Sequence, residues 1–203
     1  GVFDFRQKNF YLNFARGHNY YRLATYPFRN FEYDYIYYNR FIHQQVLDLT
    51  PQQNQKLFDY LQWNAKPENQ YYLYDYFYDN CATRIRDAVV KAFGDTVVFD
   101  TTFIKTDYSI RDLTDLYLQH QPWGDLGIDI CLGFPMDKKA SPYEYMFLPD
   151  YIESSFDHAA IIRDGRQVPL VKRKFAVFEP EQSDLPKQIF HPLYVFSLVL
   201  IVS

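Results

Sequence analysis

The chain has 203 residues, which is enough for one domain with a substantial hydrophobic core. Hydrophobic residues make up 48% and charged residues 23% of the sequence, and this composition excludes disordered and low-complexity proteins. The formal charge of -4 lacks the basic excess that binding to a phosphate backbone needs, so we expect no nucleic-acid partner. Aromatic residues account for 20% of the chain, and such side chains suit boundaries between apolar and aqueous regions.

The first fifty residues consist of short aromatic runs separated by turn residues. The runs at 20–26 and 31–38 predict strands or irregular segments. The clearest helix follows: Thr50 can cap it, Pro51 suits its first position and Gln53 can complete a capping box. Pro67 should end this helix, whose expected buried stripe is Leu57, Phe58, Leu61 and Ala65.

Residues 71–78 carry aromatic side chains at both parities, which predicts a central strand covered on both faces. A second helix should begin directly afterwards, capped by Asp79 or Asn80 and terminated by Gly94. The residues expected on its buried face are Ile85, Ala88, Val89 and Ala92.

Capping boxes that begin at Ser109 and Ser141 predict two further helices. A hairpin is expected near the end of the chain, where runs at 159–163 and 167–178 flank the turn pair Asp164-Gly165. Together with a short strand candidate at 97–99, these elements predict an α+β fold with mainly non-parallel strands.

The apolar run at 193–203 has 11 uncharged residues, whereas a helix that crosses a bilayer needs about 20. A buried terminal strand and the first half of a transmembrane helix fit this run equally well. The chain has two cysteines, Cys81 and Cys131, without the spacing of a zinc or redox motif, and we expect no metal or cofactor. Whether the two cysteines pair is left open, and the apolar neighbours of Cys131 predict a core position.

Cys81 stands where a strand is expected to end and a helix to begin. At a helix start, unpaired backbone N–H groups and the helix dipole stabilise anions, so a thiolate and a tetrahedral oxyanion would both be favoured there. Arg84, about one turn further along, would add positive potential. The alternative is that Cys81 packs as a small apolar side chain, and the sequence by itself leaves both interpretations open.

A cysteine nucleophile usually needs a histidine base. In the usual papain-like order the base follows the cysteine helix, but the strand candidate at 97–99 carries no histidine. His18 and His43 precede Cys81, and neither has a distinctive neighbourhood. The base is therefore expected either upstream of Cys81, in a permuted order, or outside the chain.

The most specific motif is Asn80-Cys81-Ala82-Thr83-Arg84-Ile85-Arg86-Asp87, and other segments support it, at 1–5, 9–11, 39–40, 47–50, 122–123, 127–129, 132–133 and 147–150. Through these segments the chain resembles the Lnb N-terminal periplasmic domain family, the extracytoplasmic part of the Bacteroidota-type lipoprotein N-acyltransferase. The family looks like a circularly permuted relative of NlpC-type papain-like enzymes. The resemblance implies that Cys81 is the nucleophile of an enzyme in the inner membrane, with its catalytic domain facing the periplasm.

The resemblance also implies a domain organisation. A papain-like catalytic domain, incomplete at its N-terminus, would span 1–187, and the beginning of a transmembrane helix would span 188–203. The histidine of the family would lie upstream of Gly1. The implied reaction moves an acyl chain from a phospholipid, through a thioester on Cys81, to the α-amine of a lipoprotein's N-terminal cysteine.

Further residues of the motif are expected to support the site. Asn80 should cap the helix or orient the site, and Arg84 should bind substrate. Arg86 and Asp87 are adjacent and point apart, so each is expected to find another ionic partner, such as Arg40 or Asp75.

Two other functions use the same residues differently. An NlpC-type cell-wall amidase or peptidase would use Cys81 with water as the acceptor, and a polar open groove would favour it. A non-catalytic module would bind lipid or glycan on its aromatic surface, and its cysteine would be inert. An apolar tunnel that faces the membrane would favour the acyltransferase.

Overall fold

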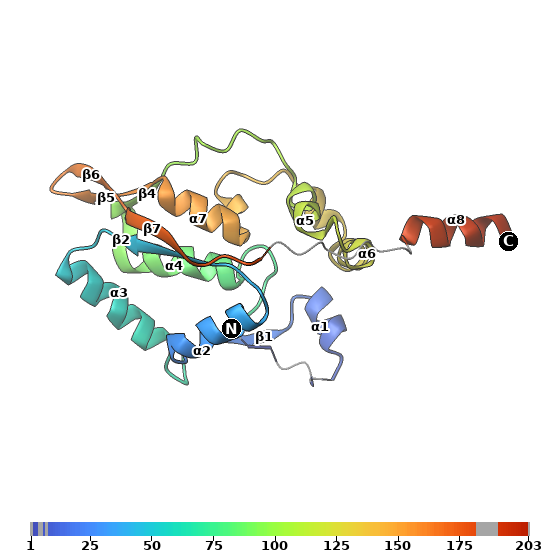
Figure 1. Ribbon diagram of the computed structural model, residues 1–203, viewed down its shortest axis with the longest axis horizontal. Helices are drawn as coiled ribbons and strands as arrows, with labels where there is room; N and C mark the ends of the chain where they lie inside the picture. Colours follow the sequence, from blue (N-terminus) through green and yellow to red (C-terminus); the bar gives the residue numbers. More distant parts are fainter. Residues whose placement is uncertain (1, 4–5, 7, 182–190, 203) are drawn as a thin grey trace. The chain divides into compact units, whose positions relative to one another are not determined.

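The computed structural model describes residues 2–3, 6, 8–181 and 191–202 (Figure 1). The chain forms two compact units, and each is described by itself. The first unit contains residues 1–105 and 142–181, and the second contains 106–141 and 182–203. The expected boundary between 187 and 188 lies outside the described residues.

The first unit combines helices with short antiparallel strands. Its α-helices are α1 (Phe10–Ala15), α2 (Phe28–Tyr37), α3 (Pro51–Asn64), α4 (Cys81–Phe93) and α7 (Pro149–Asp157). Its strands are β1 (Tyr20–Arg22), β2 (Ile42–Leu47), β3 (Tyr71–Leu73), β4 (Val97–Phe99), β5 (Ala159–Arg163), β6 (Arg166–Pro169) and β7 (Val171–Phe178). They pair as β1-β3, β2-β7 and β4-β5-β6, so the described strands confirm an α+β fold with antiparallel pairing.

The hydrophobic core of this unit gathers around α4. Ala82, Val89, Ala92 and Phe93 are buried on α4, and α7 and β5 supply Ile152, Phe156 and Ile161 against them. Asn80 caps the helix, and Gly94 ends it at a φ of 59°, a left-handed conformation that favours glycine. Both expected ends of this helix are confirmed, and its position fixes Cys81 at the first helical residue.

The capping box of α3 is confirmed, but its apolar stripe is not buried as expected. Thr50 accepts a hydrogen bond from the Gln53 backbone, and the Gln53 side chain accepts one from Thr50. Phe58 and Leu61 are 55% and 44% exposed, so the expected buried stripe is wrong at these positions. Leu61 lines an open pocket instead of packing into the core, whereas Leu57 lines the pocket and also packs against the core.

The expected central strand at 71–78 is wrong. Strand β3 has only three residues and pairs with β1 in a two-stranded sheet. The chain then turns, because the Asp75 carboxylate accepts hydrogen bonds from the backbone of Phe77 and Tyr78, both at 2.9 Å. The strand or irregular structure expected at 31–38 is also wrong, since α2 occupies most of that run.

The expected hairpin is confirmed, with Asp164 and Gly165 at positive φ between β5 and β6. Its second arm is shorter than expected, because fully buried Leu170 separates β6 from β7, which joins a different sheet. The helix expected after Ser141 is a single 3₁₀ turn, Glu144–Phe147, without a side-chain cap.

The second unit contains α5 (Ile110–Leu118), α6 (Pro122–Leu132), a 3₁₀ turn (Phe134–Asp137) and α8 (Pro192–Val202). The Ser109 capping box is confirmed, with Asp112 as its partner. The apolar C-terminal run is helical, so the strand alternative is wrong. Among the described residues, no helix combines the length and apolarity needed to cross a bilayer. Cys131 is exposed on α6, which corrects its expected core position.

Candidate active site

Cys81 is the first residue of α4, and its side chain is exposed. The preceding residue, Asn80, holds the helix start in place. Its side-chain oxygen accepts hydrogen bonds from the backbone of Ala82 at 2.8 Å and of Thr83 at 2.9 Å. Its amide group donates to the Phe147 carbonyl at 2.9 Å, which ties the helix start to a segment 67 residues away. The expected capping role of Asn80 is confirmed.

The cap changes which backbone groups can stabilise an anion. The amides of Ala82 and Thr83 are taken by Asn80, and the amide of Arg84 donates to the Asn80 carbonyl. Within the described part of the chain, the Cys81 amide has no hydrogen-bond partner. Cys81 therefore offers its sulfur and its own N–H at the positive end of the helix.

Cys81 lines a pocket of about 490 Å³ that lies within the first unit. Apolar side chains from α3, α4, α7 and β2 form most of its wall. They include Leu47, Leu57, Leu61, Ile85 and Ile152. A thiol therefore borders a hollow in which an apolar ligand would lose its contact with water.

Arg84 lines the same pocket, but its charge is already partnered. The guanidinium forms a two-pronged ion pair with Asp79 and stacks over the Tyr72 ring, with 3.8 Å from Cζ to the ring centroid. Such pairing fixes the side chain against the wall and leaves little positive charge for a second anion.

Four tyrosines surround the cysteine. Burial raises the pKa of Tyr21, Tyr72, Tyr74 and Tyr76, and negative charge on Cys81 raises each further. The four phenols therefore lie close enough to the sulfur to interact with its charge. Their raised pKa values keep them protonated at neutral pH. They contribute hydrogen-bond donors and apolar rings beside Cys81, and no additional charge.

His43 is a pocket residue whose environment the sequence did not reveal. Its Nδ1 lies 3.1 Å from a Glu153 oxygen, and its Nε2 lies 3.0 Å from Glu179. The hydrogen bond with Glu153 raises the pKa of His43; burial opposes this shift and Glu179 adds to it. Because both nitrogens face carboxylates, the ring is arranged as a cation and has no lone pair directed at Cys81. None of the other four histidines lines this pocket.

The residues expected to support the site make different contacts from those predicted. Arg86 and Asp87 pair directly at 2.8 Å, so the expectation of separate ionic partners is wrong. The long Arg86 side chain bends back to its neighbour and lies over the Tyr143 ring at 4.3 Å. Arg40 lies over the Tyr38 ring instead, and Asp75 holds the turn before α4.

A family model described as the Lnb N-terminal periplasmic domain matches residues 2–115, more than half of the chain. The chain belongs to this family. No curated protein and no solved structure matches it. Family membership makes the chain a periplasm-facing domain. The region matched by the Lnb model contains Cys81 and His43, whereas Phe147 and Glu153, which contact the site, lie beyond it.

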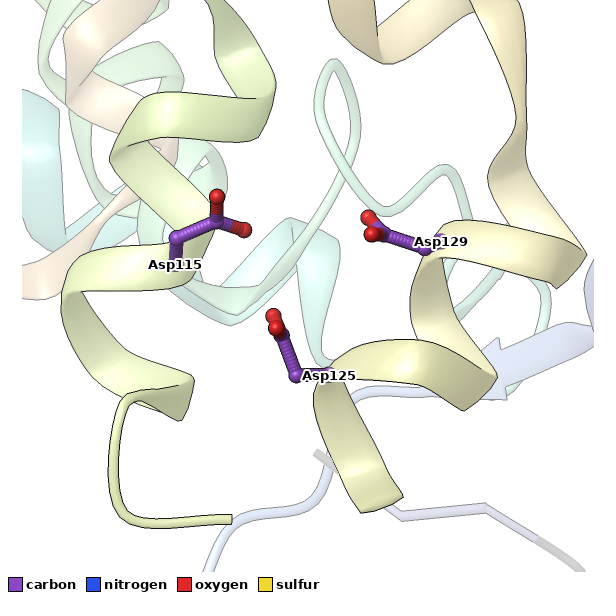
Figure 2. Close-up of side chains that lie close together, drawn as sticks. All are labelled: Asp115, Asp125 and Asp129. Atoms are coloured by element: carbon purple, nitrogen blue, oxygen red, sulfur yellow. The ribbon is translucent and has the colours of Figure 1, made fainter. Parts of the chain in front are cut away.

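Three carboxylates converge in the second unit of this Lnb-family domain, at the edge of the matched region. Oxygen atoms of Asp115, Asp125 and Asp129 lie within 4.8 Å of one another (Figure 2), as metal ligands do. Arg111 pairs with Asp129 and with Asp137. Burial, followed by the charge of Asp125, raises the pKa of Asp115 to about 6. Protonation of Asp115 and the positive charge of Arg111 therefore offset the negative charge of this cluster at mildly acidic pH.

Proposed function

We propose that this domain is the catalytic part of a lipoprotein N-acyltransferase, with Cys81 as its nucleophile. The observation that carries the proposal is the exposed Cys81 at the start of α4, bordering an apolar pocket of about 490 Å³. An acyl chain fits such a wall, since each buried methylene contributes about 0.8 kcal/mol. The family assignment supports a periplasmic location, where lipoprotein substrates are exposed.

In the first step, the Cys81 sulfur attacks the carbonyl carbon of a phospholipid ester. A carbon–sulfur bond forms, and the bond to the glycerol oxygen breaks. The thiol proton passes through the base, which the resemblance places upstream of Gly1, to the leaving oxygen. The Cys81 amide donates a hydrogen bond to the tetrahedral oxyanion, since the next three amides are already engaged.

In the second step, the α-amine of a lipoprotein's N-terminal cysteine attacks the thioester. A carbon–nitrogen bond forms, the carbon–sulfur bond breaks, and the amine proton returns to the sulfur. Transfer outcompetes hydrolysis when water is kept away, and the aromatic rings of Tyr21 and Tyr72 beside Cys81 suit that purpose. We assign Arg84 to the pocket wall, because Asp79 already pairs its guanidinium.

The test uses the full-length protein, incubated with phospholipid and analysed by intact-protein mass spectrometry. We expect an acyl mass on the wild type and on Cys131→Ala, and none on Cys81→Ala. Adding a peptide whose N-terminal cysteine has a free α-amine and a sulfur blocked as a thioether should discharge the adduct and yield an N-acyl peptide.

Two outcomes would contradict the proposal. Release of free fatty acid, with the acceptor peptide unmodified, would show that water and not an amine accepts the acyl chain. An unmodified wild-type protein in the presence of phospholipid would indicate a binding module with an inert cysteine.

A further inference from the structure

Helix α2 presents an aromatic surface that the site does not use. No residue of α2 is buried, and Tyr37 is 70% exposed. We define the α2 aromatic face as the exposed side chains of this helix and its flanks: Tyr26, Phe28, Tyr33, Ile36, Tyr37, Tyr38 and Phe41. Single exposed apolar residues are common, but here exposed rings adjoin one another, since Tyr33 stacks on Tyr37 and Tyr37 meets Tyr38 edge to face. Adjacent exposed rings of this kind mark an interaction surface.

The segment that carries this face begins and ends at the pocket. Leu23 precedes it and His43 follows it, and both line the pocket beside Cys81. The Phe41 ring lies 4.9 Å from the His43 ring. The chain just after α2 is tied to the chain just after β7, because Asn39 and Glu181 exchange two hydrogen bonds of 2.9 and 3.0 Å. The two flanks of the α2 aromatic face are therefore held at the rim of the pocket.

The chemistry of the face fits the headgroup layer of a bilayer. Tyrosine combines an apolar ring with a polar hydroxyl, and it is enriched where membranes meet water. Arg29 and Arg40 are exposed and have no carboxylate partner among the described residues, so lipid phosphates could bind them. Glu32 and Asp34 balance these charges. A segment without net charge suits zwitterionic lipid and has no need of anionic lipid.

We propose that the α2 aromatic face lies in the headgroup layer of a phospholipid bilayer and holds the pocket rim against the membrane. The statement that the bilayer lipid is also the acyl donor rests on the proposed function. The docking itself is a separate property of the surface, and it can be measured without turnover.

The first test measures depth in the membrane with the full-length protein in phosphatidylcholine vesicles that carry brominated acyl chains. Trp63 and Trp123 are replaced by Phe, so that the tryptophan introduced by Tyr37→Trp is the only one within residues 1–203. We expect its emission to shift to the blue and to be quenched by bromine, in low and in high salt. The matched control is Gln167→Trp, on the exposed hairpin strand β6, which should show neither effect.

Equal emission from the two reporters would overturn the proposal. Quenching that is absent in vesicles, with a blue shift that appears only after an acceptor peptide is added, would also overturn it, because the face would then bind protein.

The second test separates docking from catalysis. Tyr33→Ser combined with Tyr37→Ser should slow acylation of Cys81 from vesicle lipid at least about tenfold. The reason is that the protein loses two rings that would be partly buried in the membrane. Acylation from a soluble short-chain ester should be unchanged. Phe134→Ser, which alters a side chain that is 90% exposed in the second unit, is the control for loss of an exposed ring.

Equal slowing with both donors would contradict docking by α2. Absence of a Cys81 adduct from either donor in the wild type would contradict the proposed function and leave the quenching result standing.

Discussion

The two cysteines of this chain are both free and both exposed, yet they lie at opposite ends of their helices. Cys81 is the first residue of α4, whereas Cys131 is the last but one residue of α6. The N-terminal end of a helix favours an anion and the C-terminal end disfavours it. The same side chain therefore stands at the positive end of a helix dipole in one case and at the negative end in the other.

The surroundings of the two cysteines differ as well. Cys81 lines an apolar pocket whose charged residues are already paired, His43 with Glu153 and Arg84 with Asp79. Cys131 does not line this pocket and follows Ile130, which is 74% exposed. Exposure alone does not identify a nucleophile in this molecule; the polarity of the helix end and the adjacent hollow do.

Removing the cap of α4 should have the largest effect on the difference between the two cysteines. Asn80→Ala removes the acceptor of two amides and the link to Phe147, so it should lower stability by about 1–2 kcal/mol. It should also slow acylation of Cys81 about tenfold, because the sulfur is no longer held in place. Ser109→Ala, which removes the equivalent cap of α5, should lower stability without changing the acylation rate. Equal acylation rates for the two variants would show that the cap does not position Cys81.

A substitution that fills the pocket tests whether the pocket holds the acyl chain. Leu61→Trp adds volume at a partly exposed pocket position, so it should shorten the acyl chain that fits. Acylation from long-chain donors should fall about tenfold while short-chain donors react as before, because the lost chain contacts are worth about 0.8 kcal/mol per methylene. Rates measured over a series of chain lengths check this. A uniform loss would indicate that the acyl chain lies elsewhere.

The acidic cluster of the second unit gives a smaller effect, on stability. Burial raises the pKa of Asp115 to about 6, so protonation of this group stabilises the fold below its ordinary pKa of 3.8, and the contribution is lost as the pH rises through 6. Asp115→Asn should therefore stabilise α5 and α6 at pH 7 by on the order of 1 kcal/mol and have little effect at pH 4. Hydrogen exchange of the α5 and α6 amides measures this difference. Destabilisation at pH 7 would contradict the assigned protonation.

The smallest effect concerns His43. Its pKa is raised by Glu153, so its contribution to stability is present below pH 6.5 and fades as the pH passes its raised value. His43→Gln should lower the unfolding midpoint at pH 6. The corresponding loss in the free energy of unfolding should be under about 1 kcal/mol, because the His43–Glu153 pair is partly exposed. The deficit should shrink at pH 9. A deficit that grows with pH would show that the neutral ring is the stabilising form.

The sequence predicted those features that local hydrogen bonds determine. The caps at Thr50, Asn80 and Ser109 each join a side chain to a backbone group no more than three residues away, and all three are present. The Asp164-Gly165 turn is local in the same way. These features were enough to place Cys81 at a helix start before any tertiary contact was known.

Contacts between distant segments could not be predicted. Glu153 and Glu179 lie 110 and 136 residues from His43, and no spacing in the sequence connects them. The aromatic run of α2 favoured a strand by residue type, but ring contacts within the helix, such as Phe31 with Tyr35 at 4.1 Å, accompany helical spacing. Leu61 of α3 was expected in the core and lines the pocket instead.

The most direct test compares the two cysteines in one molecule. The full-length protein is treated with a limiting amount of iodoacetamide at neutral pH, and peptide mass spectrometry follows the alkylation of Cys81 and Cys131 over time. We predict that Cys81 reacts at least about tenfold faster, because the start of a helix stabilises its thiolate. A rate for Cys81 equal to or below that of Cys131 would contradict its assignment as the nucleophile.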